Sequence, residues 1–249
     1  FKKKYIPILH GGDLKKRFEN STYATEKLLK NAYHIVSPSL YYKNEVIRLG
    51  YRKVDHIPNP IFINNYQFKE RTVFQPKLLW VRAFSQIYNP LMAIKAFEII
   101  YKKYPNAKLC MVGPDKDTSM QVCIKYAEDY KLPVTFTGKL KKREWTKIAT
   151  DFDIFLNTSN IDNSPLSVIE AMALGLPIIT TNVGGMPFLI DHKVNGILIE
   201  KEGTEELAKW VEWMLDHPEQ THEISLKARE KVINLDWNKI KKDWTKLLV

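Results

Sequence analysis

The chain has 249 residues, 45% of them hydrophobic, which is enough for one large or two modest domains. Its formal net charge of +10 suits a phosphorylated ligand or an anionic membrane surface. The basic residues are scattered, apart from a short cluster at 139–143, and form no nucleic-acid recognition motif, so we expect no nucleic-acid partner.

The sequence has no apolar run long enough to span a bilayer. Its two cysteines, Cys110 and Cys123, lack the spacing of a metal site, and we expect both to be buried and reduced. The first residue is not Met, and no signal-peptide pattern follows it. We therefore expect the sequence to be a piece of a longer chain.

The first part of the chain alternates between short strand and helix patterns. Strands are predicted at residues 5–9, 34–36 and 54–57, and helices at 23–31 and from Ser37 and Pro38 to about residue 49. The strand at 5–9 would deliver His10 to a loop. Residues 63–76 are polar and irregular, which indicates a linker between two domains.

The alternation resumes at residue 77 and continues to the end of the sequence. Strands are predicted at 77–81, 109–112, 134–136, 154–156, 178–180 and 197–199, and helices at 90–104, 119–130, 143–150, 205–215, 219–233 and 237–248. This order is typical of a doubly wound parallel sheet, in which loops at the carboxyl ends of the strands form the ligand site. The loops at Gly113, Gly138, Asp162 and Gly184 should therefore share one rim.

The segment 163–175 predicts a buried helix, with residues typical of a helix start and a helix stop at its two ends. Ser164 suits the N-cap, Pro165 the first helical position and Gly175 the left-handed C-terminal stop. Every residue between these ends is apolar or small except Glu170. A buried carboxylate needs a hydrogen-bonding partner. It could reach a surface edge or pair with a lysine, or it could be held for a polar ligand.

The start of the same helix offers a site for an anion. The first-turn amides, including those of Leu166 and Ser167, have no partner within the helix, and the helix dipole lies behind them. Asp162 stands eight residues before Glu170, in the loop that enters the helix. Two carboxylates and an anion site in one segment suit a ligand with a phosphate and several hydroxyl groups.

This segment resembles the signature of the GT-B glycosyltransferases of family 4, the glycosyl transferases group 1. The resemblance comprises Asp162, Glu170, the run Ala-Met-Ala-Leu-Gly-Leu-Pro that starts at Ala171, and the Gly184-Gly185 turn. The first acidic position is usually Glu in that family and is Asp here. The signature argues against a GT-B nucleotide-sugar epimerase.

The resemblance implies an α/β fold of GT-B type, truncated at its N-terminus. Residues 77–236 resemble a complete, doubly wound (Rossmann-like) nucleotide-sugar-binding domain, and residues 1–62 resemble the last part of a second Rossmann-like domain, which binds the acceptor. Residues 63–76 would be the linker, and 237–249 a helix that crosses back to the first domain. Lacking the early strands of the acceptor-binding domain, the chain by itself could be inactive.

The implied activity is a metal-independent, retaining hexosyl transfer that uses no cofactor. A sugar would pass from a nucleotide diphosphate sugar to a hydroxyl acceptor, which could be a glycan or polysaccharide, a lipid or a small molecule. We expect a cytoplasmic protein, weakly attached to the anionic inner face of the membrane as a peripheral protein. The alternative is a nucleotide-sugar-binding module without turnover.

The resemblance also implies roles for individual residues. Asp162 would contact the donor sugar and Glu170 the ribose hydroxyls, and His10 would lie near the reacting acceptor hydroxyl, so His10 and Asp162 are the candidate catalytic residues. The remaining donor-binding candidates are Ser164, Pro165, Leu166 and Ser167 around the diphosphate, and Gly113 and Pro114 on the nucleobase side.

The chain departs from the family at the cations that face the diphosphate. The family has an Arg directly after Val-Gly and a Lys a few residues later. Here Arg82 stands one place early and Tyr88 occupies the place of the Lys. Either the strand ends sooner, so that Arg82 still reaches the phosphates, or Lys139 after Gly138 supplies the charge. Both could instead be surface cations.

Overall fold

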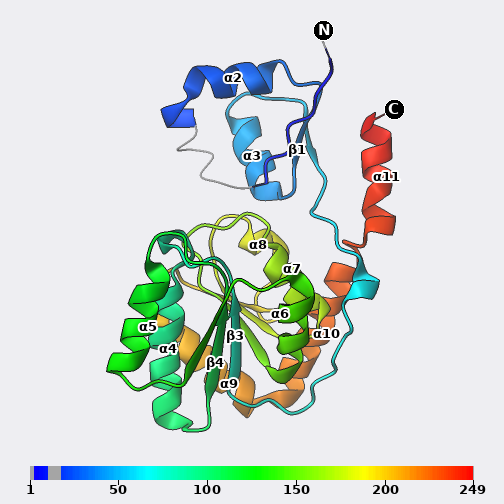
Figure 1. Ribbon diagram of the computed structural model, residues 1–249. Coiled ribbons are helices and arrows are strands. Elements are labelled where there is room, and N and C mark those ends of the chain that lie inside the picture. Colours follow the sequence, from blue (N-terminus) through cyan, green and yellow to red (C-terminus); the bar gives the residue numbers. More distant parts are fainter. Residues whose placement is uncertain (1–2, 11–17, 249) are drawn as a thin grey trace.

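The computed structural model describes residues 3–10 and 18–248 and consists of two lobes (Figure 1). The smaller lobe contains α2 (Thr22–Lys30), β1 (Ile35–Ser37), α3 (Leu40–Arg48) and β2 (Val54–His56). β1 and β2 form a two-stranded parallel sheet.

Two predictions for this lobe were wrong in detail. The strand expected at 5–9 is reduced to one isolated bridge between Ile8 and Val36, since Pro7 has no amide hydrogen to extend the ladder. Helix α3 is capped by the side chain of Ser39, which accepts a hydrogen bond from the Tyr42 amide at 3.2 Å, and not by Ser37.

The larger lobe is built on a six-stranded sheet in the order β5-β4-β3-β6-β7-β8, with all neighbouring strands parallel. The strands are β3 (Lys77–Val81), β4 (Lys108–Val112), β5 (Val134–Gly138), β6 (Ile154–Asn157), β7 (Ile178–Thr181) and β8 (Ile197–Ile199). The chain order reverses between β3 and β6, at the centre of the sheet. A ligand site is expected at the carboxyl ends of these two strands. The predicted α/β class is confirmed.

Helices connect and cover these strands. They are α4 (Pro90–Lys103), α5 (Ser119–Asp129), α6 (Lys142–Ile148), α7 (Leu166–Ala173), α8 (Met186–Leu189), α9 (Thr204–Asp216) and α10 (Pro218–Ile233), and α11 (Trp237–Leu248) follows them away from the sheet. Three short 3-10 turns, η1 (Ile63–Asn65), η2 (Gln86–Tyr88) and η3 (Ala149–Asp151), and the four-residue α8 were not predicted from the sequence. They are too short to show a periodic pattern.

The strands of the larger sheet are buried on both faces. Leu78 and Trp80 of β3 pack into the core on the side of α4, α5 and α9, whereas Leu79 between them packs into the core on the side of α6, α7 and α10. Successive strand residues point to opposite faces. The near-continuous apolar runs that predicted these strands therefore serve two cores at once.

Residues 63–76 lie against the larger lobe and hold the C-terminal end of α7. Arg71, only 3% exposed, donates from Nη1 to the carbonyls of Lys69 (3.0 Å), Leu174 (3.2 Å) and Gly175 (3.0 Å), and from Nη2 to Ala149 (3.1 Å). A guanidinium at a helix C-terminus satisfies the free carbonyls and the negative end of the dipole. This segment thus fixes the helix that points into the site.

The chain passes between the lobes twice, and the two crossings are hydrogen-bonded to each other. The Ile61 amide donates to Leu235 at 2.9 Å, and the Trp237 amide donates to Ile61 at 2.8 Å. Helix α11 then runs beside the smaller lobe (Figure 1), where Ile240 packs with Val36 and Ile57.

Candidate functional site

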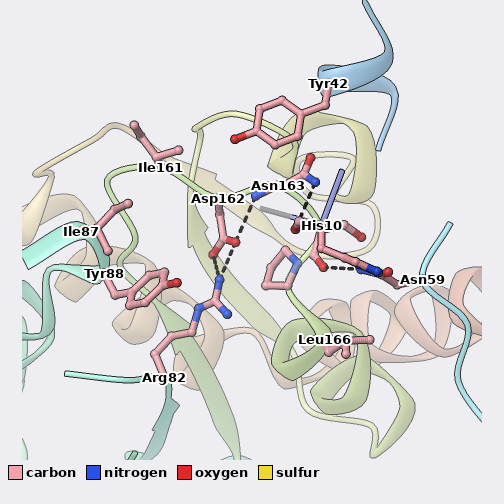
Figure 2. A pocket seen from close by; sticks show the side chains of 12 residues that line it. His10, Tyr42, Asn59, Arg82, Ile87, Tyr88, Ile161, Asp162, Asn163 and Leu166 are labelled. Atoms are coloured by element: carbon pink, nitrogen blue, oxygen red, sulfur yellow. Dashed lines mark hydrogen bonds and ion pairs between the residues drawn. The ribbon is translucent and has the colours of Figure 1, made fainter. Parts of the chain in front are cut away.

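A cavity of about 260 Å³ lies at the carboxyl ends of β3 and β6, between the two lobes. Figure 2 shows how the side chains around it are arranged. The cavity is lined by His10, Tyr42, Asn59, Arg82, Ile87, Tyr88, Ile161, Asp162, Asn163, Ser164, Pro165 and Leu166. Six of the residues predicted for the site are therefore brought together here.

Arg82 reaches the cavity because β3 ends one residue before it. Its Nη2 donates to both carboxylate oxygens of Asp162, and its guanidinium lies 4.4 Å from the centre of the Tyr88 ring (Figure 2). The residue in the place of the family lysine therefore stacks on the arginine. Arg82 Nε is buried without a hydrogen-bond partner in the described structure.

Asp162 is held by backbone and side-chain donors on its own loop. It is 7% exposed, and it accepts hydrogen bonds from the Ser159 hydroxyl at 2.9 Å and the Asn163 amide at 3.0 Å. The carboxylate is thus charge-balanced by Arg82 and fixed in direction before any ligand binds.

The backbone of the Gly184-Gly185 turn packs directly against the backbone of this loop. A Cβ at Gly184 would stand 2.1 Å from the Asp162 carbonyl oxygen, and one at Gly185 would stand 1.7 Å from that of Asn163. The Gly185 amide also donates to Asp162 at 2.9 Å. The two glycines are needed because the backbones of turn and loop lie too close for any side chain.

Helix α7 begins at Leu166, so the predicted N-cap at Ser164 was wrong. Pro165 has φ −70° and ψ 118°, an extended conformation, and no side chain caps the helix. The Ser164 carbonyl accepts a hydrogen bond from Asn59 Nδ2 at 3.0 Å. The predicted stop is confirmed, since Gly175 has φ +80°. The first-turn amides therefore have no capping side chain between them and the cavity.

Glu170 lies one turn further along α7 and is 3% exposed. The Tyr66 hydroxyl donates to its Oε1 at 2.8 Å, and Lys142 Nζ lies 2.5 Å from the same oxygen. Pairing with a lysine was one of the two explanations for a buried carboxylate. The partner was not identified from the sequence, although Lys142 belongs to the basic cluster 139–143.

The pKa values of Tyr66 and Lys142 keep both side chains protonated, so both donate hydrogen bonds to Glu170. Burial, reinforced by the charge of Glu170, raises the pKa of Tyr66 to about 12, so the phenol stays protonated. Burial lowers the pKa of Lys142, but the hydrogen bond and charge of Glu170 outweigh it and raise that pKa above its ordinary value. Lys142 is therefore an ammonium ion at neutral pH.

The remaining predicted residues lie outside the cavity lining. Gly113 packs on the strand end beside Arg82, where an added Cβ would meet the Arg82 carbonyl oxygen at 1.7 Å. The Pro114 carbonyl accepts from the Phe84 amide at 2.8 Å. The Ser167 hydroxyl is buried without a partner in the described structure, and Lys139 is exposed in the loop after β5.

Contacts from the smaller lobe close the opposite side of the cavity. Asn163 Nδ2 donates to the carbonyls of Leu9 at 3.1 Å and His10 at 3.4 Å, and the Ser39 hydroxyl donates to Asn163 Oδ1. His10 therefore stands at the cavity wall through its backbone contact with the Asp162 loop (Figure 2).

Two structural features are absent from residues 3–10 and 18–248. These residues contain no cluster of three or more His, Cys, Asp or Glu side chains arranged to bind a metal ion. Within the same residues, no helix combines the length and apolar character required to cross a bilayer.

The profile of the family "Glycosyl transferases group 1" matches residues 64–231, and this chain belongs to that family. The matched region contains the six-stranded sheet, the cavity loops and α7. The resemblance drawn from the Asp162–Glu170 segment is confirmed.

The chain is also similar in sequence to individual glycosyltransferases, at low identity. An uncharacterized glycosyltransferase from Haemophilus influenzae is 30% identical over 156 residues, which are 62% of this chain and 44% of that protein. The sulfoquinovosyl transferase SQD2 of Arabidopsis thaliana is 27% identical over 154 residues, 58% of this chain and 28% of the relative. The chain thus spans less than half of the length of either relative.

Solved structures establish the fold. Anabaena HepE, crystallised in complex with UDP, superposes with a TM-score of 0.88 at 19% identity, covering 99% of this chain and 72% of HepE. The sucrose-phosphate synthase of Thermosynechococcus elongatus gives a TM-score of 0.86 at 19% identity, covering 100% of this chain and 68% of the synthase. The fold is that of the GT-B glycosyltransferases, as predicted.

Proposed function

We propose that this chain is the donor-binding part of a glycosyltransferase that moves a sugar from a nucleotide diphosphate sugar to a hydroxyl acceptor. The observation that carries this proposal is the cavity at the switch point of the sheet, where Arg82, Asp162 and the uncapped start of α7 meet. A diphosphate needs positive charge and amide donors, and a sugar needs a carboxylate for its hydroxyl groups. The cavity provides all three.

In this proposal the phosphates lie against the first-turn amides of α7 and Arg82. The leaving diphosphate gains negative charge in the transition state, so fixed dipoles and a cation at that place lower the barrier. No metal ion or other cofactor is assigned a role. Asp162 contacts the transferred sugar, Glu170 contacts the ribose, and the backbone around Gly113 and Pro114 faces the nucleobase.

The acceptor is assigned to the smaller lobe. His10 lies across the cavity from Arg82 and would face the reacting hydroxyl (Figure 2). We assign residues 1–62 to the acceptor-binding domain, 63–76 to the linker, 77–236 to the donor domain and 237–249 to the helix that crosses back. We also propose retention of anomeric configuration and a cytoplasmic position with weak attachment to an anionic membrane face.

A hexose is the first donor sugar to test. HepE has been crystallised with UDP and glucose and with UDP-glucose, and UDP-hexoses are therefore the starting ligands for this chain. Supplying a polysaccharide, a lipid-linked sugar and a small molecule in turn as acceptor would identify the acceptor class.

One observation favours the alternative of binding without turnover. Arg82 is paired with Asp162, and Tyr88 replaces the lysine that the family places at the diphosphate. A site with one fewer cation stabilises a leaving diphosphate less. A nucleotide-sugar-binding module would tolerate that loss better than an enzyme.

The deciding experiment incubates the chain with UDP-, ADP- and GDP-hexoses, with EDTA present and with candidate hydroxyl acceptors added. Release of nucleoside diphosphate and the anomeric proton signal of the product are followed by NMR. We expect release, retained configuration and a drop of about 100-fold in rate for Asp162→Asn. Binding without release supports the module instead, and absence of nucleotide binding contradicts both.

A further inference from the structure

Glu170 has two hydrogen-bonding partners of different character on one oxygen. Tyr66 is 5% exposed and comes from the segment that is packed on the larger lobe, so its hydroxyl is held in place. The side chain of Lys142 is 58% exposed and reaches the buried carboxylate from the first residue of α6. Tyr66 is thus a fixed partner, whereas Lys142 is free to move toward solvent.

The position of Lys142 relative to the start of α7 follows from its contact with Glu170. Glu170 is four residues after Leu166, so the Cα atoms of the two residues lie about 6 Å apart along the helix axis. Side chains of a helix lean toward its N-terminus, so the Glu170 carboxylate tilts back toward the first turn. Lys142 Nζ is 2.5 Å from that carboxylate, which leans toward the amides assigned to the diphosphate.

We propose that Lys142 is a phosphate-binding residue of the donor site, and this rests on the function proposed above. In the structure its ammonium bonds to Glu170. When a nucleotide binds, the ribose hydroxyls donate to Glu170 in its place, and the ammonium turns to the diphosphate. Tyr66 keeps its hydrogen bond and holds the carboxylate in position. Lys142 thereby supplies a cation that the chain lacks at Tyr88.

The exchange is balanced in charge and in hydrogen bonds. A carboxylate only accepts hydrogen bonds, and its two oxygens offer about four lone-pair sites. Ribose hydroxyls satisfy Glu170 without adding charge, whereas a diphosphate brings negative charge that favours the nearby ammonium. Lys139 was predicted for this task from the sequence. Of the lysines at 139, 141 and 142, however, Lys142 is the one that an ion pair brings to the site.

The test measures nucleotide affinity by calorimetry for the wild type, Lys142→Gln and Lys142→Arg. Lys141→Gln is the matched control, since it removes the same charge from an exposed neighbour. The ligands are UDP, ADP and GDP, each compared with its nucleoside. We expect K142Q to weaken diphosphate binding about tenfold or more. Nucleoside binding should be unchanged or stronger, because Glu170 is uncovered. K142R should restore most of the affinity, and K141Q should stay within about twofold.

Three outcomes would overturn the assignment. Equal diphosphate affinities for K142Q and K141Q would show that Lys142 does not contact phosphate. A loss that is equal for diphosphate and nucleoside would show that Lys142 only keeps Glu170 in place. If the wild type binds no nucleotide, the proposed function itself fails and the assignment fails with it. Unfolding midpoints of all variants, measured alongside, distinguish lost binding from lost folding.

Discussion

The two carboxylates of the site are each balanced by one cation. Asp162 pairs with Arg82, which also stacks on Tyr88, and Glu170 pairs with Lys142. A buried carboxylate without such a partner would be costly. A nucleotide sugar that enters must therefore take over both functions, offering hydroxyl groups to the acids and phosphate oxygens to the bases.

His56 couples the stability of the smaller lobe to pH. Burial lowers the pKa of His56 in β2, and the charge of Lys43 acts in the same direction against a weaker opposing hydrogen bond to the Pro38 backbone. The unfolded chain therefore binds a proton at a higher pH than the folded chain does. The stability that this group contributes is present above pH 6.5 and is lost as the pH falls through the folded pKa.

We predict that the unfolding midpoint of the wild type falls further between pH 7.5 and pH 5.5 than that of His56→Gln. Denaturant unfolding followed by circular dichroism at the two pH values measures the difference. Glutamine keeps a polar side chain of similar length but cannot titrate. Equal losses in both proteins would mean that His56 is not the responsible group.

At the scale of elements, α7 depends on partners at both ends. Its N-terminal end is uncapped and faces the cavity, whereas its C-terminal carbonyls are bound by Arg71. Arg229 adds a hydrogen bond to the Ala173 carbonyl. The end that faces the site is left with free amides, and the opposite end provides the fixed anchor.

We predict that Arg71→Met lowers the free energy of unfolding by about 3 kcal/mol or more, because it removes the buried cation paired with Asp153 and the side-chain donor to several carbonyls. Chemical denaturation measures this loss. Lys69→Met is the control, since Lys69 is an exposed cation on the same segment with a single bond to the Thr150 carbonyl. The control should change stability by about 0.5 kcal/mol or less. A similar small change for R71M would contradict the anchoring role.

At the scale of the whole molecule, one loop joins the donor cavity to the smaller lobe. Asp162 faces Arg82, the next residue Asn163 binds Leu9 and His10, and Ser164 accepts from Asn59 (Figure 2). Movement of the smaller lobe would therefore be transmitted to the carboxylate assigned to the sugar. The lobes and the cavity form one connected site.

The sequence predicted the larger sheet well because strands buried on both faces leave continuous apolar runs, as at 77–81 and 154–156. Strand order alone predicted that the Asp162 loop lies at the ligand-binding rim, the resemblance to the family added Arg82 and His10, and the helix start added Leu166. The partners of Glu170 could not be predicted, because Tyr66 and Lys142 are distant in sequence and meet it only after folding. For the same reason, nothing local identified Arg71 as the anchor of α7.

The first-turn amides of α7 are proposed to bind a nucleotide diphosphate, and Leu166→Pro is the sharpest probe of that role. Proline is tolerated at the first helical position, Pro165 already has the extended conformation that a following proline requires, and the substitution removes only the Leu166 amide hydrogen. Leu166→Ala is the control, since it shortens the half-exposed side chain and keeps the amide.

Calorimetric titration with UDP, ADP and GDP measures the dissociation constant of each protein. The wild type and Leu166→Ala should bind the preferred diphosphate equally well, and Leu166→Pro should bind it about tenfold more weakly, the loss of one hydrogen bond to a charged oxygen. Equal affinities for the proline and alanine variants would show that the Leu166 amide does not bind the diphosphate.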